Sequence, residues 1–418
     1  MGDPDRITDL LRQLSAITEG GSESRGVTRL AFTKREREAH SLFADWMTAL
    51  GLSVRTDAAG NTIAERPGKH ARPAIGTGSH LDSVPEGGRF DGIAGVVAAV
   101  EVARVLAESD VAHDRPMRFV AFAGEEGARF GQACIGSKAV GGLWTAEELA
   151  RLHDADGISL ADAMRAVGID PGRISEAKWN ADDWAGFVEL HVEQGQVLEH
   201  DGYSIGIVDL ISGSTRFELA FDGQASHTGS TPMSLRHDAL VAAAEVILLA
   251  EEIATDPSHR GTRCTVGKLE VAPGSITTIP GHVKLWVDVR DVDSGRQRET
   301  ADEIVRRARL KCEGRGVTLT PRLLSDSSPV VLPAWIRKIV SAECERSATS
   351  YKVMYSGASH DTQMVNHMVP AGLIFVPSRG GLSHVPEEWT SSSDLALGVS
   401  VLTRTLLALD AHLSELGR

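Results

Sequence analysis

Five residues of the kinds that bind divalent metal ions are spread along the chain: His80, Asp91, Glu126, His191 and His384. Imidazole nitrogens and carboxylate oxygens are ligands that first-row divalent metals take. Asp91 follows His80 by eleven residues and is flanked by Phe90 and Gly92. Because glycine lets the backbone come close to a bound group, Asp91 is the candidate for a carboxylate that bridges two ions. Two such ions, about 3.5–4 Å apart, can activate one water molecule, so the set predicts a two-metal hydrolase.

The adjacent carboxylates Glu125 and Glu126 suit two different roles. Glu126 is a candidate metal ligand, and Glu125 is a candidate general base whose pKa is set by burial and by the ions together. An isolated Glu-Glu pair is more often a solvated acidic turn, and the other ligand runs argue against that alternative. In His80-x-Asp82 the carboxylate offers a partner that fixes the imidazole tautomer, although such a pair alone is usually structural.

Four of the candidate ligands follow short apolar runs that are typical of β-strands. The runs are 73–79 before His80, 117–123 before Glu126, 187–190 before His191 and 371–376 before His384. Helical periodicity lies between them, for example in 3–50 and 93–106. Strands that alternate with helices predict an α/β fold with a mixed, mostly parallel sheet. Sites in such sheets form at the carboxyl ends of strands, so these runs predict one shared site.

Residues 213–328 follow another pattern, which predicts a domain inserted into the metal-binding one. Strands are expected at 216–222, 264–271, 282–290 and 317–324, and helices at 234–254 and 297–312. The order βαββαβ indicates a ferredoxin-like α+β domain. Residues 1–212 and 329–418 then form the catalytic domain, and two domains suit a chain of 418 residues.

The inserted segment has polar candidates of its own. His227 lies in the run Gly-Gln-Ala-Ser-His-Thr-Gly-Ser-Thr-Pro-Met, and Arg216 and Arg290 lie at the ends of expected strands. Two arginines near a metal site would hold a carboxylate through paired hydrogen bonds; the alternative for each is an ordinary surface residue. The chain carries no Ser-His-Asp arrangement, P-loop or nucleotide-binding G-x-G-x-x-G.

The composition, 42% apolar and 24% charged, is typical of a soluble globular protein. The net charge of −14, without any Lys/Arg-rich run, argues against nucleic acid as a partner. Four widely spaced cysteines predict reduced, mostly buried thiols. The charged N-terminus and the lack of a long apolar stretch predict neither a signal peptide nor a membrane span. We therefore expect a cytoplasmic protein.

Taken together, the runs resemble the N-carbamoyl-L-amino-acid amidohydrolase and allantoate amidohydrolase family, within the dinuclear-metal superfamily of aminoacylases and carboxypeptidases. They keep the order and spacing of that family over nearly the whole chain. The matching strings are Gly-Ser-His-Leu-Asp-Ser-Val-Pro-Glu-Gly-Gly-Arg-Phe-Asp-Gly, Glu-Glu-Gly-Ala-Arg-Phe, His-Val-Glu-Gln-Gly, Ser-His-Thr-Gly-Ser-Thr-Pro-Met, Ser-Gly-Ala-Ser-His-Asp and Ser-His-Val-Pro-Glu-Glu.

The resemblance implies two divalent ions (Zn, Mn, Co or Ni) in each subunit. Asp91 would bridge them, with His80 and His191 on one ion and Glu126 and His384 on the other. A histidine rather than a carboxylate at the position of His191 favours this branch over the peptidases.

The resemblance also implies roles beyond the metal ligands. Glu125 would be the base, and His227 would reach the active site of the partner subunit and stabilise the oxyanion. Residues implied to contact a substrate that carries a carboxylate are Gln194, Arg216, Thr277, Arg290 and His360. The family forms homodimers through the inserted domain, which also acts as a lid.

Two departures from the family concern the substrate. Thr277 stands where the family usually has a substrate-binding Asn, and Gly213-Ser-Thr replaces the Gly-Gln-Arg of the allantoate enzymes. Allantoate is therefore disfavoured. We expect cleavage of an N-carbamoyl-L-amino acid to amino acid, ammonia and CO₂. Alternatives are an N-acyl-amino-acid hydrolase, which Thr277 favours, an allantoate- or ureidoglycolate-type ureide hydrolase, and a non-catalytic binding protein, which the retention of Glu125 and all five ligands disfavours.

Overall fold

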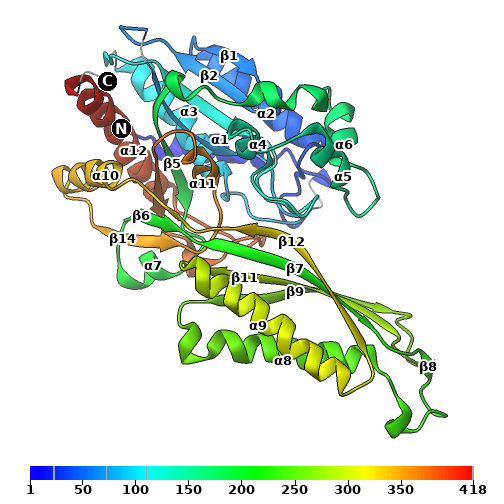
Figure 1. Cartoon of the computed structure of the whole chain (residues 1–418). Helices are drawn as coiled ribbons and strands as arrows, with labels where there is room; N and C mark the ends of the chain where they lie inside the picture. Colours follow the sequence, from blue (N-terminus) through cyan, green and yellow to red (C-terminus); the bar gives the residue numbers. More distant parts are fainter. Residues whose placement is uncertain (22–23, 72, 110, 417–418) are drawn as a thin grey trace. The chain divides into compact units, whose positions relative to one another are not determined.

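The computed structural model describes residues 1–418 except 22–23, 72, 110 and 417–418. These residues divide into two compact units, Met1–Asp209 with Val331–Arg418, and Leu210–Val330. The second unit is thus one continuous segment inserted between the two parts of the first (Figure 1). The divisions follow residues 209 and 330, against the expected 212 and 328.

A nine-stranded mixed sheet forms the centre of the first unit. Its strands are β1 (Ser53–Thr56), β2 (Thr62–Arg66), β3 (Ala74–His80), β4 (Met117–Phe122), β5 (Trp184–Val192), β6 (Ile205–Ile211), β13 (Val330–Val331), β14 (Tyr351–Ser356) and β15 (Ala371–Val376). The order is β1-β2-β4-β3-β5-β15-β6-β13, and β14 also pairs with β6. The neighbours β4-β3-β5-β15 are parallel, whereas β1, β2 and β6 join antiparallel. The predicted mixed α/β fold with a parallel centre is confirmed.

Helices lie against both faces of this sheet. The helices of this unit are α1 (Pro4–Ser15), α2 (Lys34–Ala49), α3 (Ile93–Glu108), α4 (Ile135–Val140), α5 (Ala146–Arg151), α6 (Leu160–Ala166), α7 (Val197–Asp201), α10 (Ala334–Arg346), α11 (Asp361–Val365) and α12 (Ser392–Glu415). Side chains of a strand alternate between faces. In β4, Phe119 and Ala121 accordingly join the core that holds α1, α3, α10 and α12, and Val120 and Phe122 join a second core with part of α11.

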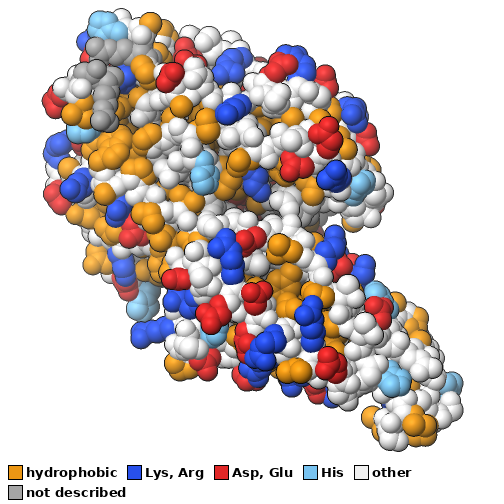
Figure 2. All heavy atoms as spheres, viewed as in Figure 1, with side chains coloured by type: hydrophobic (Ala, Val, Ile, Leu, Met, Phe, Trp, Pro, Cys, Tyr) orange, Lys and Arg blue, Asp and Glu red, His pale blue; other side chains and the backbone are white. Residues whose placement is uncertain are grey.

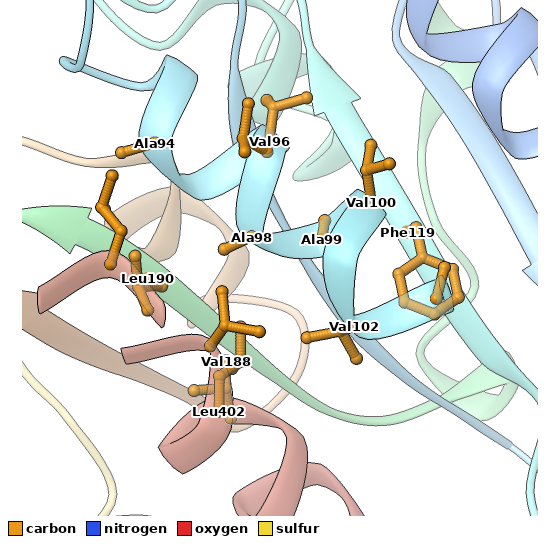
Figure 3. Close-up of a cluster of buried hydrophobic side chains, with 14 of the residues drawn as sticks. Ala94, Val96, Ala98, Ala99, Val100, Val102, Phe119, Val188, Leu190 and Leu402 are labelled. Atoms are coloured by element: carbon orange, nitrogen blue, oxygen red, sulfur yellow. The ribbon is translucent and has the colours of Figure 1, made fainter. Parts of the chain in front are cut away.

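The first core is packed around α3, which is buried along nearly its whole length. Its alanine and valine side chains lie against Val188 and Leu190 of β5 and against Leu402 of α12 (Figure 3). Among the described residues, α12 alone reaches the length and hydropathy of a membrane-spanning helix; 61% of its apolar window is buried inside the unit, where it packs on α1, α3, α10 and β5. Core packing therefore accounts for its apolar character.

The second unit is a four-stranded antiparallel sheet with two long helices. Its strands are β7 (Gly213–Asp222), β9 (Arg263–Ala272), β11 (His282–Asp291) and β12 (Thr318–Ser327), and the helices are α8 (Ala239–Thr255) and α9 (Ser294–Glu313). The strand order is β12-β7-β11-β9, which gives the βαββαβ topology expected from the sequence. Apolar residues at alternate positions of β11 form one core with α8 and α9. A short ribbon of β8 (Ser226–His227) and β10 (Thr278–Ile279) adjoins them.

The predicted start of the first long helix of this unit, at Ser234, is wrong. Met233–Leu235 forms a separate 3₁₀ turn, and α8 begins after Asp238. The Asp238 carboxylate accepts the backbone N–H groups of Leu240 and Val241, at 3.0 and 3.2 Å. This carboxylate fixes the helix start because it satisfies two donors that the first turn leaves unpaired.

Candidate metal centre

The parallel strands bring the candidate ligands to one edge of the sheet. His80 is the last residue of β3, His191 lies near the end of β5, Glu126 follows β4, and His384 follows β15. Since β4, β3, β5 and β15 are adjacent and parallel, their carboxyl ends meet at the same edge. Asp91 lies in the loop between β3 and α3. The structure thus places all five side chains in one region, as expected for the four that follow apolar runs.

The two oxygens of Asp91 face two different sets of ligands. Oδ1 lies 3.5 Å from His80 Nε2 and 3.2 Å from His191 Nε2. Oδ2 lies 3.3 Å from His384 Nε2, which is also 3.3 Å from Glu126 Oε2. Within each set the candidate ligand atoms all lie within 4.8 Å of one another. The five residues therefore form two groups of three that share Asp91.

The imidazole of His191 is turned so that a lone pair faces Asp91. Its Nδ1 lies 2.9 Å from the carbonyl oxygen of Val192, to which it donates its proton, and its Nε2 lies 3.2 Å from Asp91 Oδ1. His80 Nδ1 likewise lies 3.2 Å from the Asp82 carbonyl. A lone pair of Nε2 facing a carboxylate oxygen is repulsive unless a cation or a proton lies between them. These donors therefore fit a divalent cation.

The pKa values of the three histidines follow from the same contacts. Hydrogen bonds to Asp91 and then Glu126 raise the pKa of His384 to about 11. Burial by itself lowers the pKa of His80 and of His191, but the carboxylates around them raise both. The carboxylates that stabilise a proton on these histidines would also stabilise a metal cation, which would displace that proton on binding.

Close approach of the Asp91 loop to His80 depends on Gly92. This residue has φ +67°, and a Cβ built on it would lie 2.4 Å from atoms of the His80 ring. A side chain here would push the ring away and would also strain the backbone. The glycine that marked Asp91 in the sequence is thus required by the geometry.

Glu125 is buried beside both ligand groups. Its Oε2 lies 3.8 Å from His80 Nε2, and its Oε1 accepts a hydrogen bond from Cys134 Sγ at 3.1 Å. Burial raises the pKa of Glu125 to about 7, although the nearby His80 lowers it. A carboxylate whose pKa lies near neutrality is suited to accept and return a proton.

Asp82 does more than the sequence indicated. Its Oδ1 lies 3.4 Å from His80 Nδ1, the expected contact. The same carboxylate also accepts the backbone N–H groups of Glu125 and Glu126, at 2.8 and 3.1 Å. It therefore fixes the turn that carries both glutamates.

Two predicted substrate residues of the first unit lie against metal ligands. Gln194 has φ +57°, and its Nε2 donates to Asp91 Oδ2 at 2.5 Å. His360 is 1% exposed, and its ring centroid lies 4.4 Å from that of His191 in an edge-on arrangement. Glu189, His191 and His360 form a further buried group with metal-binding side chains, and Glu189 was not among the residues predicted from the sequence.

The four candidates of the second unit form two pairs. Thr277 lies beside His227, because the Thr277 carbonyl accepts the N–H of Thr228 at 3.2 Å. Arg216 Nε and Arg290 Nε both donate to Asp288 Oδ2, at 3.3 and 3.1 Å. The β7–β11 register thus joins two arginines that are far apart in the sequence.

Other residues that touch the centre were not singled out from the sequence. Ser383 Oγ lies 2.9 Å from Asp91 Oδ2, and Glu388 Oε2 accepts the N–H groups of Phe90 and Asp91. Both belong to the run that contains His384, Ser-His-Val-Pro-Glu-Glu. The run itself was the available signal.

Comparison with known proteins identifies the family of this chain. Residues 76–408 match the sequence profile of peptidase family M20/M25/M40. The chain belongs to this family. An M20 relative, the N-carbamoyl-L-amino-acid amidohydrolase of Paenarthrobacter aurescens, is 40% identical over 97% of this chain and 98% of its own length. The ureidoglycolate hydrolase of Arabidopsis thaliana is 34% identical over 97% of this chain and 87% of its own length.

The fold is similar to that of a solved M20 relative. The crystal structure of an amidase of the hydantoinase/carbamoylase family from Burkholderia vietnamiensis matches with a TM-score of 0.90 and 31% identity, over 98% of this chain and 97% of that one. The resemblance found in the sequence is confirmed: the chain is a metal-dependent M20 hydrolase of amide or ureide bonds in small molecules.

Proposed function

We propose that this hydrolase cleaves an N-carbamoyl-L-amino acid to the amino acid, ammonia and CO₂. The observation that carries the proposal is the placement of Asp91, with one oxygen toward His80 and His191 and the other toward His384 and Glu126. Each group offers three donors of the kinds that Zn, Mn, Co or Ni accept. Two bound divalent cations would polarise the scissile carbonyl and acidify a water molecule.

Glu125 is the proposed proton carrier of the reaction. It accepts a proton as water adds to the ureido carbon, and it returns that proton to the departing nitrogen as the C–N bond breaks. The carbamic acid left by this step loses CO₂. One water is consumed, and one amino acid, one ammonia and one CO₂ are formed. Asp82 and Cys134 hold the Glu125 turn and carboxyl in place.

His227 is the proposed oxyanion donor. Its Nδ1 accepts the backbone N–H groups of Gly229 and Ser230, at 3.0 and 3.2 Å. The proton of the neutral ring is therefore on Nε2, where it is free to be donated to an oxyanion. Loss of such a donor typically costs on the order of 10²–10³ in kcat.

A homodimer is part of the proposal, with His227 serving the active site of the partner subunit. Large apolar side chains near this residue are exposed: Met233 by 77%, Leu235 by 65% and Ile276 by 98%. Figure 2 shows hydrophobic side chains at the end of the unit that carries β8 in Figure 1. A surface of this kind suits contact with a second copy.

The substrate carboxylate is proposed to bind Arg216 and Arg290, which Asp288 already holds in a fixed orientation. A guanidinium suits a carboxylate because it offers donors in a fixed fork. Gln194, Thr277 and His360 are proposed to complete the substrate site. A ureide of the ureidoglycolate type is the second candidate, which the Arabidopsis relative favours.

A substrate panel tests the proposal. Protein stripped of metal and reloaded with Zn²⁺ or Mn²⁺ would be assayed on N-carbamoyl, N-acetyl and N-formyl amino acids and on ureidoglycolate, with Glu125→Gln as the inactive control. Ammonia and amino acid released together from the N-carbamoyl compounds would support it. Faster turnover of ureidoglycolate or of the N-acetyl compounds would replace it.

A further inference from the structure

We infer that Glu388 is a positioning residue that holds the loop of His384 against the loop of Asp91. It thereby assembles the second group of metal ligands, which consists of Asp91, Glu126 and His384. This inference rests on the proposed function. Glu388 is 2% exposed. Its Oε2 accepts the backbone N–H groups of Phe90 and Asp91, at 2.9 and 3.1 Å. Two backbone N–H groups of the Asp91 loop thus donate to one carboxylate oxygen, and Glu388 lies 297 residues beyond Asp91 in the sequence.

The other oxygen of Glu388 reaches the Asp91 side chain through Ser383. Ser383 Oγ lies 2.7 Å from Glu388 Oε1 and 2.9 Å from Asp91 Oδ2. Asp91 Oδ2 is the oxygen that faces His384. The carboxyl group of Glu388 therefore contacts the loop backbone directly and the bridging carboxylate through one hydroxyl.

The Asp91 loop is shaped to receive Glu388. A Cβ built on Gly88 would lie 1.9 Å from Glu388 Oε2, so only glycine leaves room for the carboxylate. The next residue, Trp389, packs edge-on against Phe90, with ring centroids 5.6 Å apart. The two loops are thus joined at the carboxylate, at the hydroxyl and at a pair of rings.

His384 depends on this junction more than the other histidines do. His80 and His191 belong to strands, and their side chains are 2% and 1% exposed. The His384 side chain is 52% exposed and lies on a loop with φ +60°. Without Glu388, the group of His80, Asp91 and His191 keeps its strand supports, whereas the group of Asp91, Glu126 and His384 loses the tie between two of its three members.

Zinc titration of metal-free protein tests the inference. Wild type, Glu388→Ala, Glu388→Gln and Ser383→Ala would be titrated with Zn²⁺ in a calorimeter, with unfolding followed separately. Glu387→Ala is the matched control, because Glu387 is the adjacent residue, its side chain is 59% exposed, and it forms an ion pair with Arg25 on the surface. Metal binding is measured directly, so the readout does not depend on activity.

We expect Glu388→Ala to keep one tight ion and to bind the second at least tenfold more weakly, the scale on which partners of metal ligands act. Glu388→Gln should stay within about threefold of wild type, because an amide can accept the backbone N–H groups and donate to Ser383. Ser383→Ala should also lower the affinity for the second ion. This variant provides the test if Glu388→Ala fails to fold. Glu387→Ala should bind both ions normally.

The inference would be overturned if a folded Glu388→Ala protein bound both ions with wild-type affinity, or if its affinities for both ions fell equally. A Glu388→Gln variant that binds the second ion as weakly as Glu388→Ala would also overturn it. Wild-type binding of both ions by Ser383→Ala would overturn the path through the hydroxyl. Wild-type protein that binds fewer than two ions would instead overturn the proposed function, and this inference with it.

Discussion

The carboxylate of Asp82 holds the backbone of Glu125, whose N–H donates to Asp82 Oδ1 at 2.8 Å across 43 residues of sequence. The N–H of Glu126 donates to the other oxygen. One side chain at the end of β3 thus orients both the proposed base and a proposed metal ligand after β4. The parallel pairing of β3 with β4 brings these groups together.

Replacement of Asp82 by alanine should lower the free energy of unfolding by about 2–4 kcal/mol, because one buried and one partly buried N–H donor would lose their acceptor. Asp82→Asn keeps one acceptor oxygen and should lose roughly half as much. Urea unfolding of the metal-free proteins measures both. Equal losses in the two variants would show that the charge of Asp82, rather than its hydrogen bonds, matters.

Glu125→Gln should lower kcat by several orders of magnitude while both metals stay bound, because only proton transfer is removed. Steady-state kinetics measures kcat, and elemental analysis measures the metal content. Near-native turnover of the metal-loaded variant would contradict the assignment of Glu125 as the base.

The same variant should change the pH dependence of stability. Burial raises the pKa of Glu125 from 4.5 to about 7, so the folded protein holds this proton more tightly than the unfolded chain. The resulting stabilisation is full below about pH 4.5 and is lost as the pH rises through about 7. Metal-free Glu125→Gln should therefore be more stable than wild type at pH 8, by on the order of 2 kcal/mol, with a smaller difference at pH 5. A constant difference across this range would count against it.

Asp91→Ala should reduce the metal content from about two ions per chain to one or fewer, because the shared ligand of two mutually repelling cations is lost. Elemental analysis after dialysis measures the content. A variant that retains two ions would show that Asp91 is not the bridge.

Arg290→Ala should raise KM and lower kcat/KM for substrates that carry a carboxylate. The loss of kcat/KM should correspond to about 2–4 kcal/mol of transition-state stabilisation. Amides without a carboxylate should be poor substrates of the wild type and lose little more. Arg322→Ala is the control, because Arg322 lies on β12 of the same unit and pairs with Glu218. An equal loss for both kinds of amide would assign Arg290 a structural role.

Thr277→Asn should shift preference toward N-carbamoyl amino acids over N-acetyl ones. An amide supplies a donor and an acceptor where one hydroxyl serves now. The ratio of kcat/KM values for a matched pair of substrates measures the shift. An unchanged ratio would place Thr277 outside the substrate site.

The strands that carry the ligands, and the ligand types, could be predicted from the sequence, since the apolar runs before His80, Glu126 and His191 have a local signature. The contacts of Glu388 could not, because a hydrogen bond to the N–H of Asp91 spans 297 residues and leaves no periodic trace. The start of α8 was misplaced for a related reason. The residue types at 234–237 are compatible with either a turn or a helix. The hydrogen bonds that the Asp238 side chain accepts decide where the helix begins.

The place of β15 has a consequence for how the protein is made. This strand lies between β5 and β6 in the sheet, yet it follows β6 and the whole inserted unit along the chain. The nascent chain therefore cannot close its larger sheet when β5 and β6 leave the ribosome, whereas all four long strands of the inserted unit emerge without interruption. Folding during synthesis should complete the inserted unit first. The hydrolase site then assembles last, when β15 fills the gap and His384 follows it.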